Sequence, residues 1–394
     1  MTLLPLLPPE GQLVVLGART HLDTLAQTQL RAVAQQPVEW PVVFHEAARH
    51  GVAALVDRAL SQLAEDDAGP PLVPSEVHED FQAFARTLAL HNLGQTQELL
   101  RLVQHFEANG VPVIPFKGPA LAACIYGNPS YRIYGDIDIM VPRAQHGQAR
   151  QLLDELGYRL YHNHPPEVLE RLIDAQLGIE YIHASEQALI ELHWAFLNRI
   201  YGFALEPAAV WDRHQQRTFA GVSIRTFADE DLLIYLCVHG NKHKWVKLNW
   251  ITDVAELIRA SPDLDWATVE ARSRALGVWR ILKISILLTH DLLGAPIPPP
   301  LVHTARQDRA AYRMAQRVTE NWIFGGDTGT DWESFWYHAR ERERWADNLG
   351  FVRHHIKLAF TPSEKDRDFM DLPDNLSFLY LLVRPARLVR DALR

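Results

Sequence analysis

The chain has 394 residues, of which 47% are hydrophobic and 22% charged, which is the composition of a globular protein. Its formal net charge of −9 argues against a broad nucleic-acid-binding surface, because a polyanion binds where the field is positive. The two cysteines, Cys124 and Cys237, have no metal-binding or redox spacing, which indicates core positions and a reducing, cytoplasmic compartment. No stretch approaches the ~18 apolar residues of a membrane span, and the proline-broken N-terminus lacks the basic region of a signal peptide.

The first 90 residues are predicted to be helical. Apolar residues recur at three- and four-residue spacing, which is typical of amphipathic helices. This spacing covers three stretches: Leu22–Gln35, Val42–Leu63 and Glu76–Ala108. Four polar side chains would share one helix face: His45, Glu46, Arg49 and His50. We interpret this face as solvated. We interpret the helices as a cover for a sheet, and they could form one wall of a cleft.

The most informative stretch begins at Val111. Val111–Phe116 is predicted to be a short strand that breaks at Lys117 and Gly118. Pro119–Tyr126 then has the pattern of a helix with proline in its first turn. A strand, a glycine turn and a helix N-terminus form a place where backbone N–H groups can meet an anion, and Lys117 lies at its mouth.

The next predicted strand, Ile133–Val141, carries two carboxylates. Asp136 and Asp138 are two residues apart, so they project from one face at roughly 7 Å between Cα atoms. Two carboxylates held together repel each other and resist desolvation, and a divalent cation or a raised pKa is the usual remedy. A solvated edge strand is the alternative, because this spacing alone is a weak signal.

A second strand, Ala188–Trp194, carries a third carboxylate. Its alternation places Glu191 and His193 on one face, so strand pairing could bring Glu191 beside Asp136 and Asp138. We interpret His193 as a hydrogen-bonded sheet histidine, with a direct role at a metal as the alternative.

Helices and further strands alternate around these two strands. The expected elements are a helix over Ala144–Leu156, a strand over Tyr158–Tyr161, a helix over Pro166–Gln176, and a hairpin of Gly178–His183 with Ala188–Trp194. The pattern predicts an α+β fold in which a small mixed sheet is flanked by N-terminal and C-terminal helical regions. We expect a helical region at 1–90, the sheet-containing core at 91–205 and a mostly helical domain at 206–394.

The C-terminal half is predicted to be helical after a short strand at Val222–Phe227, with Asp229 capping the first helix. His239 and His243 are four residues apart and share a face of this helix, and Asp253 follows on the next one. The group is either a packed seam, in which Asp253 pairs with a histidine or lysine, or a cluster that faces a cleft. A zinc site is disfavoured, because the spacing lacks the glutamate of H-E-x-x-H.

Two stretches near the C-terminus combine apolar and charged residues. Trp336–Phe360 is predicted to be a solvated amphipathic helix. Phe378–Arg394 mixes apolar residues with four arginines, and we expect it to pack against the domain rather than on a membrane surface or a partner.

Taken together, these motifs resemble the nucleotidyltransferase fold of the DNA polymerase β superfamily. More narrowly, they resemble a bacterial family of uncharacterised nucleotidyltransferase-like proteins. The motifs that carry the resemblance are Lys117-Gly118, Tyr126, Arg132, Gly135-Asp136-Ile137-Asp138, Glu191-Leu192-His193-Trp194 and the segment His239–His243. The resemblance covers the chain from about Pro41 to the segment Arg384–Leu388.

The resemblance implies transfer of a nucleoside monophosphate from a nucleoside triphosphate, with ATP as the expected donor, to a hydroxyl acceptor, with release of pyrophosphate. It implies that Asp136 and Asp138 hold two Mg²⁺ (or Mn²⁺) ions and that Glu191 completes the site near the attacking group. Six further residues are expected to bind the nucleotide: Lys117, Gly118, Arg132, His239, Lys242 and His243. The acceptor is expected to be a small molecule, a peptide or a protein, since the negative charge disfavours a nucleic acid.

One departure from the superfamily pattern concerns Pro119. The superfamily usually has a serine here that touches a phosphate, whereas proline offers neither a hydroxyl nor an N–H, so Lys117 is expected to make this contact. This departure leaves open a nucleotide-binding module that has lost turnover. A separate alternative is a metal-dependent phosphohydrolase that uses His239, His243 and Asp253.

Overall fold

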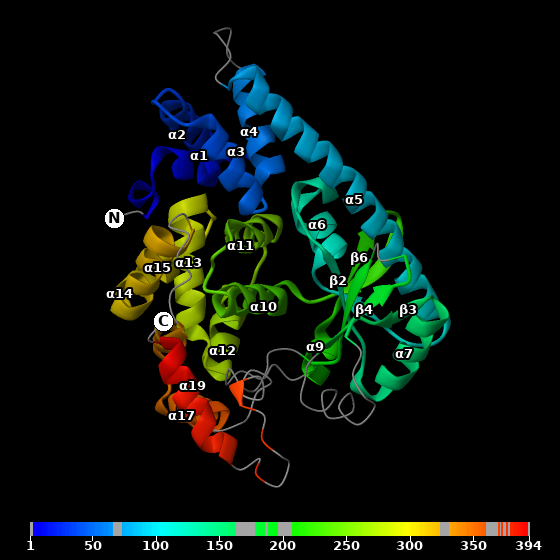
Figure 1. Ribbon diagram of the computed structural model, residues 1–394. Coiled ribbons are helices and arrows are strands. Elements are labelled where there is room, and N and C mark those ends of the chain that lie inside the picture. The colour runs from blue at the N-terminus through cyan, green and yellow to red at the C-terminus, as the bar shows by residue number, and fades with distance from the viewer. Residues whose placement is uncertain are drawn as a thin grey trace.

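The computed structural model describes residues 3–65, 73–162, 178–185, 188–195, 207–323, 331–359, 369–370, 372, 376 and 379–392. A small sheet lies beside two groups of helices, with the N-terminal helices at one end and the C-terminal helices along one side (Figure 1). This arrangement confirms the predicted α+β fold. No helix within these ranges is long and apolar enough to cross a membrane.

Five strands form the central sheet in the order β1-β2-β5-β4-β3. They are β1 (Ile114–Pro115), β2 (Asp136–Met140), β3 (Tyr158–Leu160), β4 (Gly178–His183) and β5 (Leu189–His193). The pair β2–β5 is parallel, and the other pairs are antiparallel, so the sheet is mixed, as predicted. The register of β2 with β5 places Asp138 directly opposite Glu191.

The two faces of this sheet have different surroundings. One face contributes Ile137, Ile139, Ile190 and Leu192 to a buried apolar cluster. That cluster also contains residues of α5 (Ser75–Ala108) and α7 (His146–Glu155), namely Leu99, Leu102, Phe106, Leu152 and Leu153. Because side chains alternate along a strand, the carboxylates of β2 and β5 project from the opposite face. That face looks toward α6 (Gly118–Tyr126) and the C-terminal helices (Figure 1).

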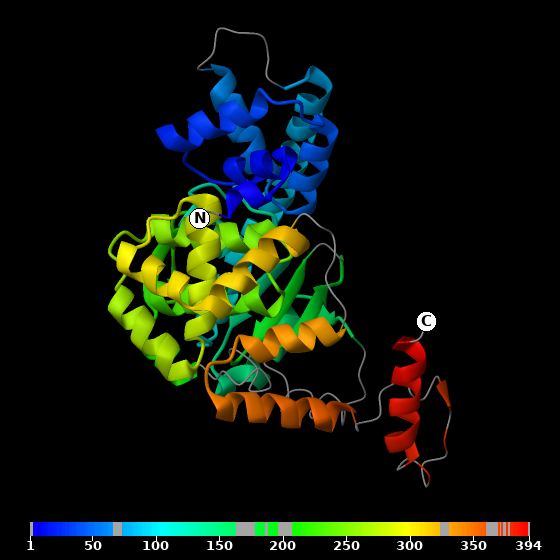
Figure 2. The ribbon, with the colours of Figure 1, turned by 90° about the vertical axis from the view of Figure 1, so that its left-hand side faces the viewer.

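The N-terminal helices are α1 (Pro9–Gly17), α2 (Thr24–Ala34), α3 (Trp40–Arg49), α4 (Ala53–Glu65) and α5. The single helix expected over Val42–Leu63 is two helices, broken at Gly51. Gly51 has φ +72°, and a Cβ there would lie 2.4 Å from the side chain of Ile133. The break therefore lets the α3–α4 corner pack against the chain that leads into β2. In Figure 2, α1 to α4 form a bundle at one end of the molecule.

His50 corrects the solvated-face interpretation of α3. Its side chain is fully buried, and its Nδ1 accepts a hydrogen bond from the Leu248 N–H at 3.1 Å. Its carbonyl oxygen accepts another from the Asn249 N–H at 3.2 Å. Burial opposes ionisation of Glu46, but hydrogen bonds from His50 and Arg49 hold the pKa of Glu46 to about 2. His50 therefore joins the end of α3 to α11, whereas His45 on the same face is exposed, as expected.

The C-terminal half begins with α9 (Pro207–Arg213) and a hairpin of β6 (Gln215–Phe219) and β7 (Val222–Thr226). The second strand was predicted, whereas its partner β6 was not. The helices that follow are α10 (Asp229–Lys242), α11 (Leu248–Ala260), α12 (Trp266–Leu276), α13 (Trp279–Leu293), α14 (Pro299–Gln307) and α15 (Arg309–Arg317), with a π-helix over Val318–Ile323. Helices α10, α11 and α13 are buried along most of their length.

Two local expectations for this half are wrong. Asp229 does not cap α10, because its carboxylate instead accepts hydrogen bonds from Arg217, at 2.6 and 2.8 Å, and from the Ser261 hydroxyl at 2.7 Å. The helix expected over Trp336–Phe360 is divided between α16 (Asp331–Arg340) and α17 (Trp345–Ala359). Ion pairing in the first case and a non-helical stretch at 341–344 in the second override the local sequence pattern.

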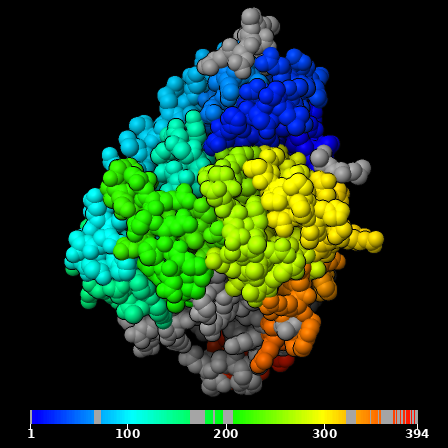
Figure 3. Space-filling model, turned by 180° about the vertical axis from the view of Figure 1, so that it is seen from behind, coloured from blue at the N-terminus to red at the C-terminus, as the bar shows by residue number. Residues whose placement is uncertain are grey.

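Among the described residues, the C-terminal helix α19 (Tyr380–Ala392) contacts α17 and stands apart from the body of the molecule (Figure 2), so its expected packing against the domain stays a prediction. Figure 3 shows the N-terminal helices, the sheet region and the C-terminal helices meeting in one continuous surface. The helix expected over Pro166–Gln176 lies outside the described residues. Helix α5 crosses residue 90, where the first part of the chain was expected to end.

Candidate active site

The parallel pairing of β2 and β5 assembles the carboxylates that the sequence singled out. Asp136 and Asp138 leave β2 on one face, and Glu191 lies opposite Asp138 on β5. His193 shares the face of Glu191. One ligand atom from each of Asp138, Glu191 and His193 can be chosen so that all three lie within 4.8 Å of one another. The structure thus brings His193 into the cluster, where the sequence had favoured a purely structural histidine.

Asp138 lies at the centre of this cluster and is 1% exposed. Its Oδ1 is 2.7 Å from Nζ of Lys117 and 3.2 Å from Nε2 of His193. Its Oδ2 is buried and has no hydrogen-bond partner in the part of the chain that the structure describes. Burial opposes ionisation, but Lys117 and His193 together hold the pKa of Asp138 below its usual range. The same ion pair raises the pKa of Lys117, against the effect of its burial.

The two aspartates of β2 have opposite shifts. Burial raises the pKa of Asp136, and the neighbouring charge of Asp138 adds to this effect. Burial opposes ionisation of Glu191, but a hydrogen bond from His193 lowers its pKa. Hydrogen bonds to Asp138 and Glu191 outweigh burial and raise the pKa of His193 to about 9. In the metal-free protein at neutral pH, an imidazolium and an ammonium therefore neutralise the buried carboxylates.

The turn before α6 approaches β2 closely. Gly118 has φ +55°, and a Cβ at this position would lie 2.7 Å from the carbonyl oxygen of Asp136. Only glycine fits here, because other residues rarely adopt this positive φ and any side chain would collide with the backbone of β2. Lys117 is the N-cap residue of α6, and Pro119 lies in its first turn. The glycine turn thus holds Lys117 against the carboxylates.

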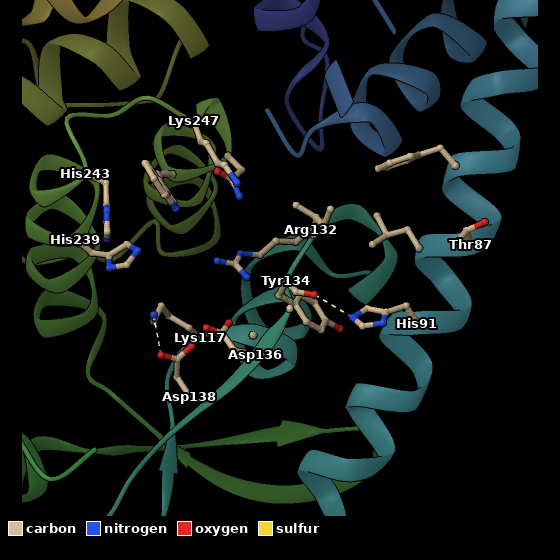
Figure 4. A pocket seen from close by; sticks show the side chains of 17 residues that line it. Thr87, His91, Lys117, Arg132, Tyr134, Asp136, Asp138, His239, His243 and Lys247 are labelled. Carbon is tan, nitrogen blue, oxygen red and sulfur yellow. Dashed lines mark hydrogen bonds and ion pairs between the residues drawn. The ribbon is translucent and has the colours of Figure 1, made fainter. Parts of the chain in front are cut away.

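A pocket of about 650 Å³ opens beside this cluster (Figure 4). The β2 side contributes Lys117, Gly118, Arg132, Ile133, Tyr134, Gly135, Asp136 and Asp138. Helix α5 contributes Phe84, Thr87, Leu88 and His91, and the α10–α11 side contributes His239, His243, Lys247, Asn249 and Trp250. The pocket therefore lies where the N-terminal helices, the sheet and the C-terminal helices meet.

The α10–α11 wall of this pocket is aromatic. The ring of His243 lies 4.9 Å from that of Trp250 at 32°, and the ring of His239 lies 5.8 Å from Trp250 at 89°. Burial, with repulsion from Lys242 as the next cause, lowers the pKa of His243 to about 4. Burial also lowers the pKa of His239 well below its ordinary value. Both histidines are therefore neutral at neutral pH, and with Trp250 they offer flat faces to a ligand.

Arg132 lines the pocket, but its guanidinium is engaged elsewhere. Its Nε is 2.7 Å from Oδ1 of Asp253, and its Nη2 is 2.9 Å from Oδ2. The Tyr126 hydroxyl donates to the same carboxylate at 2.6 Å, and all three side chains are buried. The partners expected for Asp253, a histidine or a lysine, were therefore wrong. The geometry favours a structural role for Arg132.

The other expected site residues are placed differently. Lys242 is exposed and does not line the pocket, although Glu191 and Lys117 are among its charged neighbours. His239, His243 and Asp253 do not form a metal-binding group; within the described ranges, Asp138, Glu191 and His193 do. The phosphohydrolase alternative therefore lacks its metal centre in this structure.

Sequence reasoning missed several residues that line the pocket. The α5 residues Phe84, Thr87, Leu88 and His91 are spaced as one helix face, which was a usable signal. Tyr134, whose carbonyl oxygen lies 3.1 Å from Nε2 of His91, and Trp250 had no comparable signal. Their positions depend on contacts between distant segments.

Comparison with known proteins gives a family and two distant structures. The model of a family described as uncharacterised nucleotidyltransferase matches residues 36–294. A solution structure of the antibiotic-resistance factor ANT(2'')-Ia is 16% identical, covering 47% of this chain and 94% of its own, with a TM-score of 0.34. A crystal structure of ANT(2'')-Ia in complex with adenylyl-2''-tobramycin is also 16% identical, covering 46% and 97%, with a TM-score of 0.35. No curated protein matches the sequence.

Proposed function

The chain belongs to the uncharacterised nucleotidyltransferase family, and we propose that it transfers a nucleoside monophosphate from a nucleoside triphosphate to a hydroxyl acceptor, releasing pyrophosphate. One observation carries this proposal. Asp136 and Asp138 on β2 lie beside Glu191 on β5, at the edge of a pocket of about 650 Å³. Phosphoryl-group transfer depends on positioning and charge neutralisation, and three carboxylates beside a pocket would hold the cation that provides both.

The donor atoms fit a divalent cation. Asp136, Asp138 and Glu191 supply carboxylate oxygens, which are the ligands that Mg²⁺ and Mn²⁺ take in proteins. The buried Oδ2 of Asp138 has no hydrogen-bond partner among the described residues, so a cation would satisfy it. When bound, the cation would neutralise phosphate oxygens and align them with the nucleophile. Asp136, Asp138 and Glu191 would hold it.

Other residues of the chain would bind the triphosphate and the base and accept the proton of the acceptor. Lys117 lines the pocket beside Asp138, so its ammonium would balance triphosphate charge and make the phosphate contact that Pro119 cannot make. The neutral rings of His239 and His243, with Trp250, would pack against the base. Glu191 would accept the proton of the acceptor hydroxyl, and its side chain is 33% exposed, so an acceptor can reach it.

The test is thermal stabilisation by each of the four nucleoside triphosphates, with and without Mg²⁺ or Mn²⁺. We expect metal-dependent stabilisation by one nucleotide, lost in Asp136→Asn/Asp138→Asn and retained in Asp154→Ala, which removes an exposed carboxylate on α7. Pyrophosphate release during an acceptor screen then measures turnover. No stabilisation by any nucleotide would refute the proposal.

Pro119 favours a second candidate, a nucleotide-binding module without turnover. Proline has neither the hydroxyl nor the N–H with which this turn contacts a phosphate in the superfamily. Metal-dependent nucleotide binding, with no pyrophosphate release from any acceptor or from water, would select this candidate over the transferase.

A further inference from the structure

The imidazole of His193 points one nitrogen at the carboxylate cluster. Its Nε2 lies 3.2 Å from Oδ1 of Asp138 and 3.4 Å from Oε2 of Glu191. His193 and Asp138 are both buried, at 8% and 1% exposure. A nitrogen and two carboxylate oxygens therefore converge on one point on the face of the inner strands β2 and β5.

The surroundings of the ring hold it in this orientation. The Phe116 ring packs against it edge-on, with centroids 5.0 Å apart at 73°. On the other side is Gly178 of β4, where an added Cβ would lie 2.8 Å from Nδ1 and 3.0 Å from Cε1 of His193. The same Cβ would lie 3.2 Å from Oε1 of Glu191. The missing side chain at Gly178 thus makes room for both groups and leaves Nε2 facing the carboxylates.

This donor set differs from one made of oxygens alone. Carboxylates suit Mg²⁺ and Mn²⁺, whereas imidazole suits transition metals and binds Mg²⁺ poorly. Oδ2 of Asp138, buried and without a hydrogen-bond partner within the described ranges, adds a further donor atom. We propose that Nε2 of His193 releases its proton to solvent when the metal binds and becomes a direct ligand of the divalent cation, and that the site therefore selects Mn²⁺ or Co²⁺ over Mg²⁺. The inference rests on the proposed function and specifies its metal.

Lys117 competes with the metal for the carboxylate of Asp138. Its Nζ lies 2.7 Å from the same oxygen of Asp138 that His193 contacts. An ammonium and a divalent cation repel each other at such a distance, so metal binding displaces Lys117 from Asp138. Because Lys117 lines the pocket, the displaced ammonium would be able to contact a triphosphate there. Lys117 is thus a counter-ion of the metal-free site that becomes available to the nucleotide.

The test measures metal ligation directly on the full-length protein. Mn²⁺ is added to metal-depleted protein without nucleotide, and nitrogen coupling is read by electron spin echo envelope modulation. We expect ¹⁴N modulation that changes to that of ¹⁵N when only the histidines are ¹⁵N-labelled, which separates His193 from the amine of Lys117. The coupling should be lost in His193→Gln. The coupling should persist in the matched control His183→Gln, which alters a histidine of β4 that is hydrogen-bonded to Ser185 and is not part of the carboxylate cluster.

Affinity gives an independent readout. Loss of the nitrogen ligand in His193→Gln should weaken Mn²⁺ binding by about tenfold or more and Mg²⁺ binding by much less. Wild-type protein that binds Mn²⁺ without histidine coupling would overturn the proposal, and so would equal weakening of both metals. The wild-type spectrum can overturn the proposal even if His193→Gln does not fold, and retained coupling in His239→Gln and His243→Gln would then assign the ligand to His193. Histidine coupling without pyrophosphate release would refute the transferase and leave this ligand assignment standing.

Discussion

Nζ of Lys117 and Oδ1 of Asp138 lie 2.7 Å apart, and the side chains are only 12% and 0% exposed. In Lys117→Met the cation is removed, so the metal-free protein keeps a buried carboxylate with less compensation and loses about 3 kcal/mol of unfolding free energy. Metal no longer competes with an ammonium, so Mn²⁺ binding should tighten while nucleotide binding weakens. Urea unfolding, Mn²⁺ titration and nucleotide calorimetry measure the three effects.

The control for this prediction is Lys117→Arg, which retains the charge and should shift all three quantities less. If Lys117→Met weakened Mn²⁺ binding as well, Lys117 would support the metal site rather than compete with it.

Gly178→Ala tests the space that the carboxylate cluster needs. The new Cβ would overlap the His193 ring, so we expect a loss of about 1–3 kcal/mol of unfolding free energy together with weaker Mn²⁺ binding. Gly94→Ala is the matched control, because a Cβ there meets nothing within 4 Å in the middle of α5. It should stabilise the protein by up to about 1 kcal/mol. Similar unfolding curves for the two variants would show that Gly178 is not sterically required.

The buried Arg132–Asp253 pair predicts strong coupling in a double-mutant cycle. Arg132→Met should cost about 3–5 kcal/mol, because it leaves a buried carboxylate unpaired, and Asp253→Leu should cost a similar amount. The double variant should cost much less than the sum, since neither charge then remains. Urea unfolding of the four proteins gives the coupling energy. Additive losses would instead favour a role for Arg132 outside this pair.

The lowered pKa of His243 predicts a stability that falls with acid. The unfolded chain protonates this histidine near pH 6.5, whereas the folded protein holds its pKa to about 4. Between about pH 7 and pH 4 the unfolded state therefore binds more protons, and folding stability declines as the pH falls. With allowance for the partial exposure of His243, its share is on the order of 1–2 kcal/mol.

His243→Gln should flatten this decline, as measured by urea unfolding at several pH values. His303→Gln, an exposed histidine on α14, is the control and should leave the slope unchanged. An unchanged slope in His243→Gln would contradict the assigned cause.

How much of this site the sequence predicts depends on how local each feature is. Strand alternation alone placed Asp136 and Asp138 on one face and Glu191 on another strand, because the period of a strand is local. The register that sets Glu191 opposite Asp138 needed the paired strands.

Features that depend on distant segments were not predicted from the sequence. The Arg132–Asp253 pair joins residues 121 positions apart, and no local pattern indicates it. His50 has polar neighbours along α3, which suggested exposure, yet contact with α11 buries it. Gly178 lies in an unremarkable strand pattern, and its steric role appears only when His193 is in place.

Helix α5 runs without interruption for 34 residues, from Ser75 to Ala108. Its first half packs on the N-terminal bundle, its middle forms a wall of the pocket, and its last turns belong to the core of the sheet (Figure 1). A chain shortened at residue 90 would lose its N-terminal helices and also expose the apolar surfaces that they cover. The boundary near residue 90 is therefore a poor place to divide this protein for expression, and a shortened form that keeps the whole of α5 must begin before Ser75.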